Sequence, residues 1–297
     1  MIKILKKIGL KPLIWKIRSR IFPNDEIART NCDLLGSYRY LEKYKYVLDK
    51  FDQQHFLEQS SLSCADKKVW VCWLQGIENA PYIVQKCVES IKKHSLDYEV
   101  ILLDKNNIKN YISLPSYIEE KHLKGIIPNA HYTDYIRVIL LAKYGGIWID
   151  STFFLTDKLP DYIAESDLFL FNKEYMTKVS AANSLVAANA HNPIILQLCD
   201  LLSEYWKREN KLISYSIFHL FLTMIISHNE FNRNCWKKVP RFPSENIDVL
   251  QKELFEDFSE KRFEQIKQIS TIHKLSYKFS EELFNKENTF YKKLFFY

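Results

Sequence analysis

Residues 129–152, NAHYTDYIRVILLAKYGGIWIDST, set the strongest limits on how this chain can fold. Their first part is rich in apolar residues and predicts a largely buried helix, in which Asp134 and Arg137, three positions apart, share one face. Two glycines then allow a left-handed cap and a tight turn, and residues 147–149 predict a buried strand. Asp150 follows the strand at its carboxyl end, and open α/β sheets bind their ligands at the carboxyl ends of their strands.

The pattern on either side of this segment predicts further elements of an α/β fold. Apolar runs predict strands at residues 69–74, 99–103 and 167–172, and one-sided apolar spacing predicts a helix at residues 82–94. The first two strands and the helix between them form a strand–helix–strand unit, which implies parallel strands and a right-handed crossover. Asn192 followed by Pro193 predicts the start of another helix, because these residues suit its cap and first turn.

The helix, glycine turn and strand together carry a specific motif. Its residues, in order, are Thr133, Asp134, Arg137, Tyr144, Gly145, Gly146, Ile147, Trp148, Ile149, Asp150, Ser151 and Thr152. In this arrangement the chain resembles the family-32 glycosyltransferases of the bacterial capsular polysaccharide synthesis type and, more distantly, the glucosylating clostridial toxins. Those proteins have S/A-D-x-x-R on a helix, then Y-G-G, a hydrophobic strand and D-x-D or D-x-T. A lone D-x-T triplet arises by chance, whereas all these parts in fixed register are specific.

The resemblance implies an α/β fold of GT-A type, that is, a Rossmann-like nucleotide-sugar-binding domain with helical extensions at both termini. That domain would span residues 63–278, between a basic, amphipathic helical extension at 1–62 and an aromatic, basic tail at 279–297. A chain of 297 residues can bury the core of one such domain with additions, and no linker rich in Gly, Ser or Pro divides its sequence.

The resemblance also assigns roles to single residues. Donor-binding residues would be Trp73, Gln75, Asp134, Arg137, Tyr144, Gly145, Gly146, Asp150 and Lys278. Asp134, Arg137 and Asp150 would be catalytic, and Asn183 would lie on the acceptor side. Asp150, Thr152 and His273 would hold Mn²⁺ or Mg²⁺. Thr152 stands where relatives with a full D-x-D have a second acid, and this departure leaves open how strictly the protein depends on metal.

The implied activity is transfer of a hexose from a nucleotide sugar, UDP-linked, to a lipid-linked oligosaccharide in capsular or surface polysaccharide synthesis, with retention of the anomeric configuration. Such transfer requires that cationic groups or a metal ion neutralise the departing diphosphate.

The alternatives are a degenerate fold that binds nucleotide or glycan without turnover and, for Asp134 and Arg137, a structural ion pair. Packing or capping is the predicted role of His131, His191, Tyr215 and His219. Nucleic acid is not an expected partner, because the lysines are spread along the chain without a nucleic-acid motif.

The cysteines and the N-terminal segment bear on the cellular location of the protein. The six cysteines, at 32, 64, 72, 87, 199 and 235, form no C-x-x-C pair, which predicts reduced thiols in a cytosolic protein. Residues 1–22 combine basic side chains, and no acidic ones, with apolar residues at helical spacing. This pattern is typical of a helix on an anionic membrane surface, with docking on the catalytic domain as the alternative. We therefore expect a cytoplasmic protein associated peripherally with the inner face of the cell membrane. The tail at 290–297, FYKKLFFY, either packs into the core or shares that contact.

Overall fold

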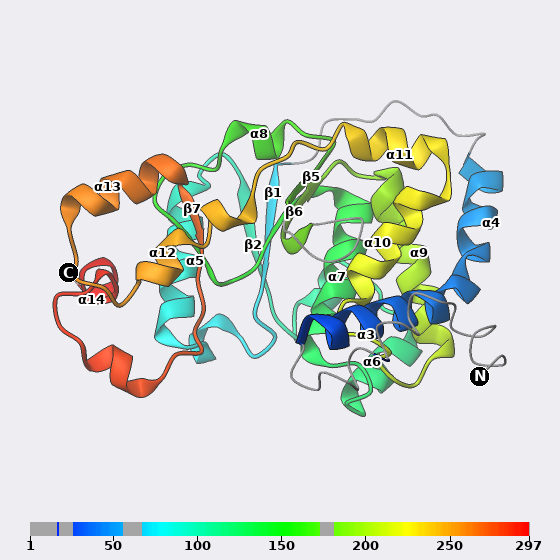
Figure 1. Ribbon diagram of the computed structural model, residues 1–297, viewed down its shortest axis with the longest axis horizontal. Coiled ribbons are helices and arrows are strands. Elements are labelled where there is room, and N and C mark those ends of the chain that lie inside the picture. Colours follow the sequence, from blue (N-terminus) through cyan, green and yellow to red (C-terminus); the bar gives the residue numbers. More distant parts are fainter. Residues whose placement is uncertain (1–16, 18–25, 56–66, 173–180, 297) are drawn as a thin grey trace.

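A five-stranded mixed sheet forms the centre of the protein (Figure 1). The structure is a computed structural model and describes residues 17, 26–55, 67–172 and 181–296. The strands, in sheet order, are β2 (Glu99–Leu103), β1 (Lys68–Cys72), β3 (Gly146–Ile149), β6 (Ala182–Ala188) and β5 (Leu168–Phe171). β1 is parallel to β2 and β3, whereas β6 is antiparallel to β3 and β5. The predicted α/β class and the parallel strands of its first unit are confirmed.

Helices surround this sheet. They are α3 (Glu26–Leu41), α4 (Tyr46–His55), α5 (Tyr82–His94), α6 (Ser116–Leu123), α7 (Asn129–Tyr144), α8 (Asp161–Ala164), α9 (Pro193–Arg208), α10 (Ile217–His228), α11 (Glu230–Lys237), α12 (Val249–Glu253), α13 (Glu260–Ile269) and α14 (Phe290–Phe296). α5 begins and ends as predicted, and the predicted strand at 99–103 is β2. Asn192 caps α9 by accepting a hydrogen bond from the backbone N–H of Ile194 at 3.0 Å.

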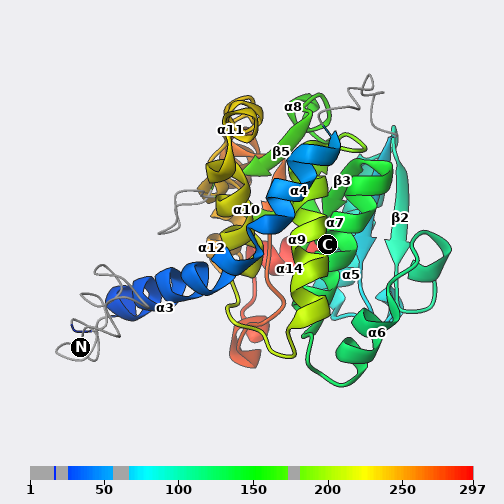
Figure 2. The same cartoon turned by 90° about the vertical axis from the view of Figure 1, so that its right-hand side faces the viewer.

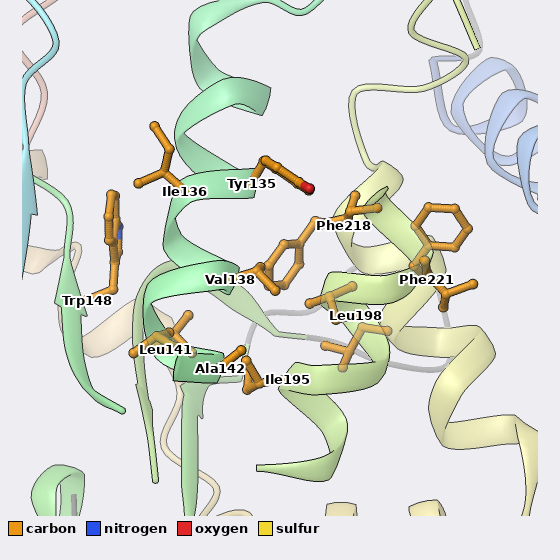
Figure 3. Close-up of a cluster of buried hydrophobic side chains, with 14 of the residues drawn as sticks. Tyr135, Ile136, Val138, Leu141, Ala142, Trp148, Ile195, Leu198, Phe218 and Phe221 are labelled. Atoms are coloured by element: carbon orange, nitrogen blue, oxygen red, sulfur yellow. The ribbon is translucent and has the colours of Figure 1, made fainter. Parts of the chain in front are cut away.

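The alternation of side chains along the strands divides the core into two layers. Trp148 of β3 faces α7, whereas its neighbours on either side face the opposite layer with α5. Figure 3 shows α7 packed between β3 and the helices α9 and α10: Ile136 points toward Trp148, and Tyr135 points toward Phe218. Because α7 is held on both sides, the polar side chains in its first half have a rigid support.

A second, two-stranded ladder brings the C-terminal part of the chain to the end of β3. β4 (Phe153–Leu155) pairs antiparallel with β7 (Ile272–Lys274), and Phe153 lies opposite Lys274. The pairing continues past the strands, since the backbone N–H of Leu275 donates to the carbonyl of Thr152 at 2.9 Å. Residues more than a hundred positions apart in sequence are thereby held side by side directly after Asp150.

Both terminal extensions are helical where the structure describes them. α3 and α4 pack against α10 and α9, and Figure 2 shows α3 reaching out beyond that layer. The predicted amphipathic helix at 1–22 lies outside the described residues except for Ile17. In the tail, Phe290, Tyr291 and Phe295 are buried against α5 and α12, so the tail packs into the core. Among the described helices, none combines the length and apolar character needed to cross a bilayer.

The two glycines of the motif have the conformations that the turn requires. Gly145 caps the C-terminus of α7 with φ +66°, and Gly146 follows with φ +94°. A Cβ atom on Gly146 would lie 2.5 Å from the carbonyl oxygen of Lys68 on β1, which is closer than real contacts allow. The close approach of β3 to β1 therefore depends on a residue without a side chain.

We expect Gly146→Ala to destabilise the protein by about 3 kcal/mol, because it adds backbone strain and a clash with a strand that cannot move. Gly125→Ala is the matched control. Gly125 also has a positive φ, +69°, but a Cβ atom there would meet nothing within 4 Å, so about 1 kcal/mol is expected. Urea unfolding of both variants measures the difference, and equal losses would contradict the role of close packing.

Candidate active site

A pocket of about 660 Å³ opens at the carboxyl ends of β1 and β3. This volume is within the range of sites for small ligands and cofactors. Its lining comes from residues 72–75 at the end of β1, Asn129, Ala130, Thr133, Asp134 and Arg137 of α7, Trp148 and residues 150–152 at the end of β3, Asn183 of β6, Tyr215, Ser216 and His219 at the start of α10, and residues 274–278 from the end of β7. The predicted location of the site at this edge of the sheet agrees with the position of the pocket.

Arg137 joins two carboxylates at the floor of this pocket. Its Nη1 lies 2.7 Å from Asp134 Oδ1, and its Nη2 lies 3.0 Å from Asp150 Oδ1. The guanidinium is buried and lies over the ring of Trp148, 4.9 Å from its centroid. Trp148 Nε1 also donates to Asp150 Oδ1 at 3.0 Å. Asp150 directly follows β3 and lies two positions after Trp148, so both side chains face α7. This explains how the end of the strand meets Asp134 and Arg137.

Asp134 is the most desolvated acid of the group, with 14% of its side chain exposed. Burial raises its pKa to about 6, because the loss of hydration outweighs the attraction of Arg137, and the negative charge of Asp150 adds to the rise. Asn183, predicted for the acceptor side, donates from Nδ2 to Asp134 Oδ1 at 3.0 Å. The carboxylate is thus fixed by two donors and is still ionised in most molecules at pH 7.

Lys274 completes the group, and sequence reasoning did not identify it. Its ammonium donates to the hydroxyl of Thr152 and lies 3.7 Å from Asp150 Oδ2. Neighbouring residues of a strand point to opposite faces, so His273 and Lys274 cannot both face the pocket. The pairing of β7 with β4 decides between them, and no local pattern near residue 274 reveals that pairing.

His273, predicted as a metal ligand, is not brought to Asp150 and Thr152. Its side chain is fully buried on the other face of β7, where Nε2 lies 3.3 Å from Thr156 Oγ1. Burial lowers the pKa of His273 to about 4, so the ring is neutral at pH 7. In this structure His273 is a core residue outside the pocket.

Three residues predicted to bind the donor, Tyr144, Gly145 and Gly146, lie at the opposite end of β3. A strand rises by about 3.3 Å per residue, so Gly146 is roughly 13 Å from Asp150. Gly146 lines a smaller pocket of about 300 Å³ at the other edge of the sheet. Tyr144 donates from its hydroxyl to the carbonyl of Tyr111 at 2.7 Å. The structure therefore gives this part of the motif a structural role, which is to turn the chain from helix to strand.

The other predicted donor-binding residues do line the pocket, as do residues that were expected only to pack. Trp73, Gln75 and Lys278 lie on its wall. Trp73 contacts Tyr277 edge to face, with ring centroids 5.5 Å apart. Tyr215 and His219 also line the pocket, because α10 begins beside α7. The apolar sequence of α10 does not indicate that it lies next to α7.

The side chains of the pocket offer few free ligands to a divalent metal ion. In the described part of the chain, no group of three or more His, Cys, Asp or Glu side chains is arranged to hold one. Mg²⁺ and Mn²⁺ favour six oxygen ligands. Here Asp150 is already bonded by Arg137 and Trp148, and the hydroxyl of Thr152 is bonded by Lys274. These residues do not fit a resident divalent ion.

Comparison with known proteins identifies the class. The chain is 28% identical over 160 residues to O-glycosyltransferase braB of Annulohypoxylon truncatum, a match covering 48% of this chain and 38% of braB. It is 27% identical over 106 residues to O-glycosyltransferase PaGT of Phomopsis amygdali, covering 33% of this chain and 26% of PaGT. The chain thus spans less than half the length of these fungal relatives.

Two solved structures of the same class resemble the protein weakly. The PaToxG glycosyltransferase has 15% identity and a TM-score of 0.40, with 84% of this chain and 95% of that chain covered. The glycosyltransferase GlyE of Streptococcus pneumoniae TIGR4 has 13% identity and a TM-score of 0.38, with 77% and 62% covered.

Both sequence relatives are glycosyltransferases. Within that class, the family model for capsular polysaccharide synthesis proteins matches residues 25–294. The chain belongs to this family, and the resemblance indicated by the motif is confirmed.

Proposed function

We propose that the protein is a GT-A-type glycosyltransferase that moves a hexose from a UDP-linked sugar to a lipid-linked oligosaccharide in capsular or surface polysaccharide synthesis. The observation that carries the proposal is the connected group of Asp134, Arg137, Asp150 and Lys274 at the carboxyl ends of β1 and β3. Such a group offers carboxylate acceptors for sugar hydroxyls beside cations for a diphosphate.

Each side of the pocket suits one part of a nucleotide sugar. The ring of Trp73 and the amide of Gln75 would contact the base, and Lys274 and Lys278 would contact the diphosphate. Asp134 and Asp150 would accept hydrogen bonds from sugar hydroxyls, held in place by Arg137. Catalysis would then consist of positioning and charge stabilisation in a pocket whose groups are already oriented.

Retention of the anomeric configuration is what the resemblance to the family implies, and the contacts of the two acids bear only on its route. Asp134 and Asp150 are both bonded to Arg137, so neither is free to attack the anomeric carbon. The acceptor hydroxyl would instead approach from the side that the diphosphate leaves, and the diphosphate would take its proton. NMR of the first-formed linkage should show an α-glycoside from an α-linked donor, and a β-linked product would rule out this route.

The proposed partners and location rest on the basic N-terminal segment. Residues 1–22 would hold the protein on the anionic inner face of the cell membrane, close to a lipid-linked acceptor. In this arrangement the pocket takes a soluble donor from the cytoplasm, and the membrane supplies the acceptor.

Transfer is expected to fall as the pH drops through about 6, because Asp134 then gains a proton and loses its charge. One pH unit below the pKa, roughly a tenth of the molecules keep the carboxylate, so about a tenfold loss is expected at pH 5. The pH dependence of kcat/KM measures this. In Asp134→Asn the residual activity should be flat over the same range. If Asp134→Asn shows the same inflection near pH 6, another group is responsible for the pH dependence. His131 beside Asp134 is not a suitable candidate, since burial lowers the pKa of His131 to about 4.

Nucleotide sugars screened with purified full-length protein test the function. UDP binding is measured by calorimetry, and donor hydrolysis and transfer to a lipid-linked acceptor in anionic vesicles are measured by product release. Hydrolysis or transfer with a UDP-sugar supports the proposal. UDP binding without turnover of any donor would support the non-catalytic alternative. Failure to bind any nucleotide or nucleotide sugar would contradict the proposal and leave only the glycan-binding form of that alternative.

A further inference from the structure

The place where a metal ion would be expected in this pocket already contains a positive charge. The ammonium of Lys274 bonds the hydroxyl of Thr152 and lies 3.7 Å from Asp150 Oδ2. Lys274 and Asp150 have 26% and 30% of their side chains exposed, so both are accessible from the pocket that they line. The threonine that replaces the second acid of a D-x-D is therefore the hydrogen-bonding partner of a lysine.

The fold holds this lysine firmly. Lys274 lies opposite Phe153 in the β4–β7 ladder, and its backbone N–H donates to the carbonyl of Ile247 at 2.8 Å. Its ammonium also lies 5.6 Å from the centroid of the Phe153 ring, a contact that favours a cation. Backbone pairing on both sides thus places the charge independently of any bound ion.

A divalent ion would compete with this arrangement. It would need the oxygens of Asp150 and Thr152. Asp150 Oδ1 already accepts hydrogen bonds from Arg137 and Trp148, Asp150 Oδ2 lies 3.7 Å from the ammonium of Lys274, and the hydroxyl of Thr152 accepts a hydrogen bond from Lys274. It would also have to approach an ammonium within a few ångströms, and like charges at such a distance repel strongly in a partly desolvated pocket. The two acids and two bases of the group already balance, so the cluster has no excess negative charge to attract a metal.

We propose that Lys274 is a catalytic residue that supplies the charge usually provided by a divalent ion, and that transfer by this protein is independent of metal. This inference rests on the proposed function. An ammonium has three N–H donors, and Thr152 takes one, which leaves others for phosphate oxygens.

In the transfer step, the bond between the anomeric carbon and the phosphate oxygen breaks, and the oxygen keeps the electron pair. Lys274 remains protonated and donates hydrogen bonds to the departing diphosphate, which lowers the cost of its new charge. The acceptor oxygen forms the new bond to the anomeric carbon, and its proton passes to the diphosphate. No other reactant is consumed.

Removal of metal tests the inference directly. Full-length protein treated with EDTA, with its metal content measured, should retain transfer within about twofold of the untreated protein, and its UDP affinity should not depend on Mn²⁺. Lys274→Met should lower kcat by about a hundredfold or more, as expected for loss of one group that stabilises the leaving oxygen. Lys274→Arg should recover part of that loss, which a merely structural role would not predict if both variants unfold at the same temperature.

A charge exchange makes the test sharper. The double variant Thr152→Asp/Lys274→Ala contains a D-x-D and lacks the ammonium, so Mn²⁺ should stimulate its transfer and EDTA should abolish that gain. The inference is overturned if EDTA removes more than nine-tenths of wild-type transfer and Mn²⁺ restores it, an outcome that leaves the proposed function intact. The proposed function itself fails if wild-type protein transfers no sugar with or without metal.

Discussion

Asp150→Asn is expected to reduce transfer by about a thousandfold while leaving the fold intact. Asp150 is the point at which Arg137, Trp148 and Lys274 meet, so its negative charge orients the whole group. Asparagine keeps the shape but removes the charge that pairs with two cations. Because 30% of the side chain is exposed, the loss of unfolding free energy should stay below about 1 kcal/mol.

Steady-state kinetics of transfer, together with urea unfolding, measure both effects of the Asp150 substitution. Asp97→Asn is the control, because Asp97 is an exposed acid in the smaller pocket at the opposite edge of the sheet. That variant should transfer sugar at the wild-type rate. Near-normal turnover by folded Asp150→Asn would show that the carboxylate is not part of the machinery.

Arg137→Met should abolish transfer and also destabilise the protein by about 3–5 kcal/mol. The substitution keeps an apolar stem over Trp148 but leaves Asp134 and Asp150 without their shared partner in a desolvated pocket. Uncompensated buried charge is costly, and Asp134 has little solvent contact to relieve it. Urea unfolding at pH 7.5, above the pKa of Asp134 in the native protein, measures the loss.

A surface pair provides the matched control for Arg137. Arg262 forms two hydrogen bonds with Glu253, at 2.9 and 2.6 Å, but its side chain is 39% exposed. Arg262→Met should therefore leave the free energy of unfolding nearly unchanged, although its pairing looks equally good. Comparable losses for the two variants would contradict the argument from burial.

The double variant Arg137→Met/Asp134→Asn separates a structural from a functional ion pair. Removing the charge of Asp134 should recover much of the stability lost in Arg137→Met, because the double variant no longer buries the unpaired charge of Asp134. Transfer should remain lost, since the carboxylate that we propose to bind the sugar and the guanidinium are both gone. Recovery of activity along with stability would mean that the pair serves the fold alone.

The sequence by itself was sufficient for the elements whose signals are local. The helix α5, the strand β2, the cap at Asn192 and the turn at Gly145 and Gly146 all follow from apolar spacing or from residues with special backbone preferences. The meeting of Asp134 and Arg137 is also local, because it depends on a three-residue spacing along one helix. Asp150 was placed correctly because a strand that follows a glycine turn ends at a predictable edge of the sheet.

Long-range pairing decided the rest of the site. Lys274 reaches Thr152 across 122 positions of sequence, and a shift of one residue in the β4–β7 register would present His273 instead. The motif also does not reveal that Tyr144 and Gly146 belong to the far end of β3, since residues close in sequence lie at opposite edges once a strand extends between them. Local preferences determine which elements form and what each can present, whereas the register between distant strands determines which charge stands beside Asp150.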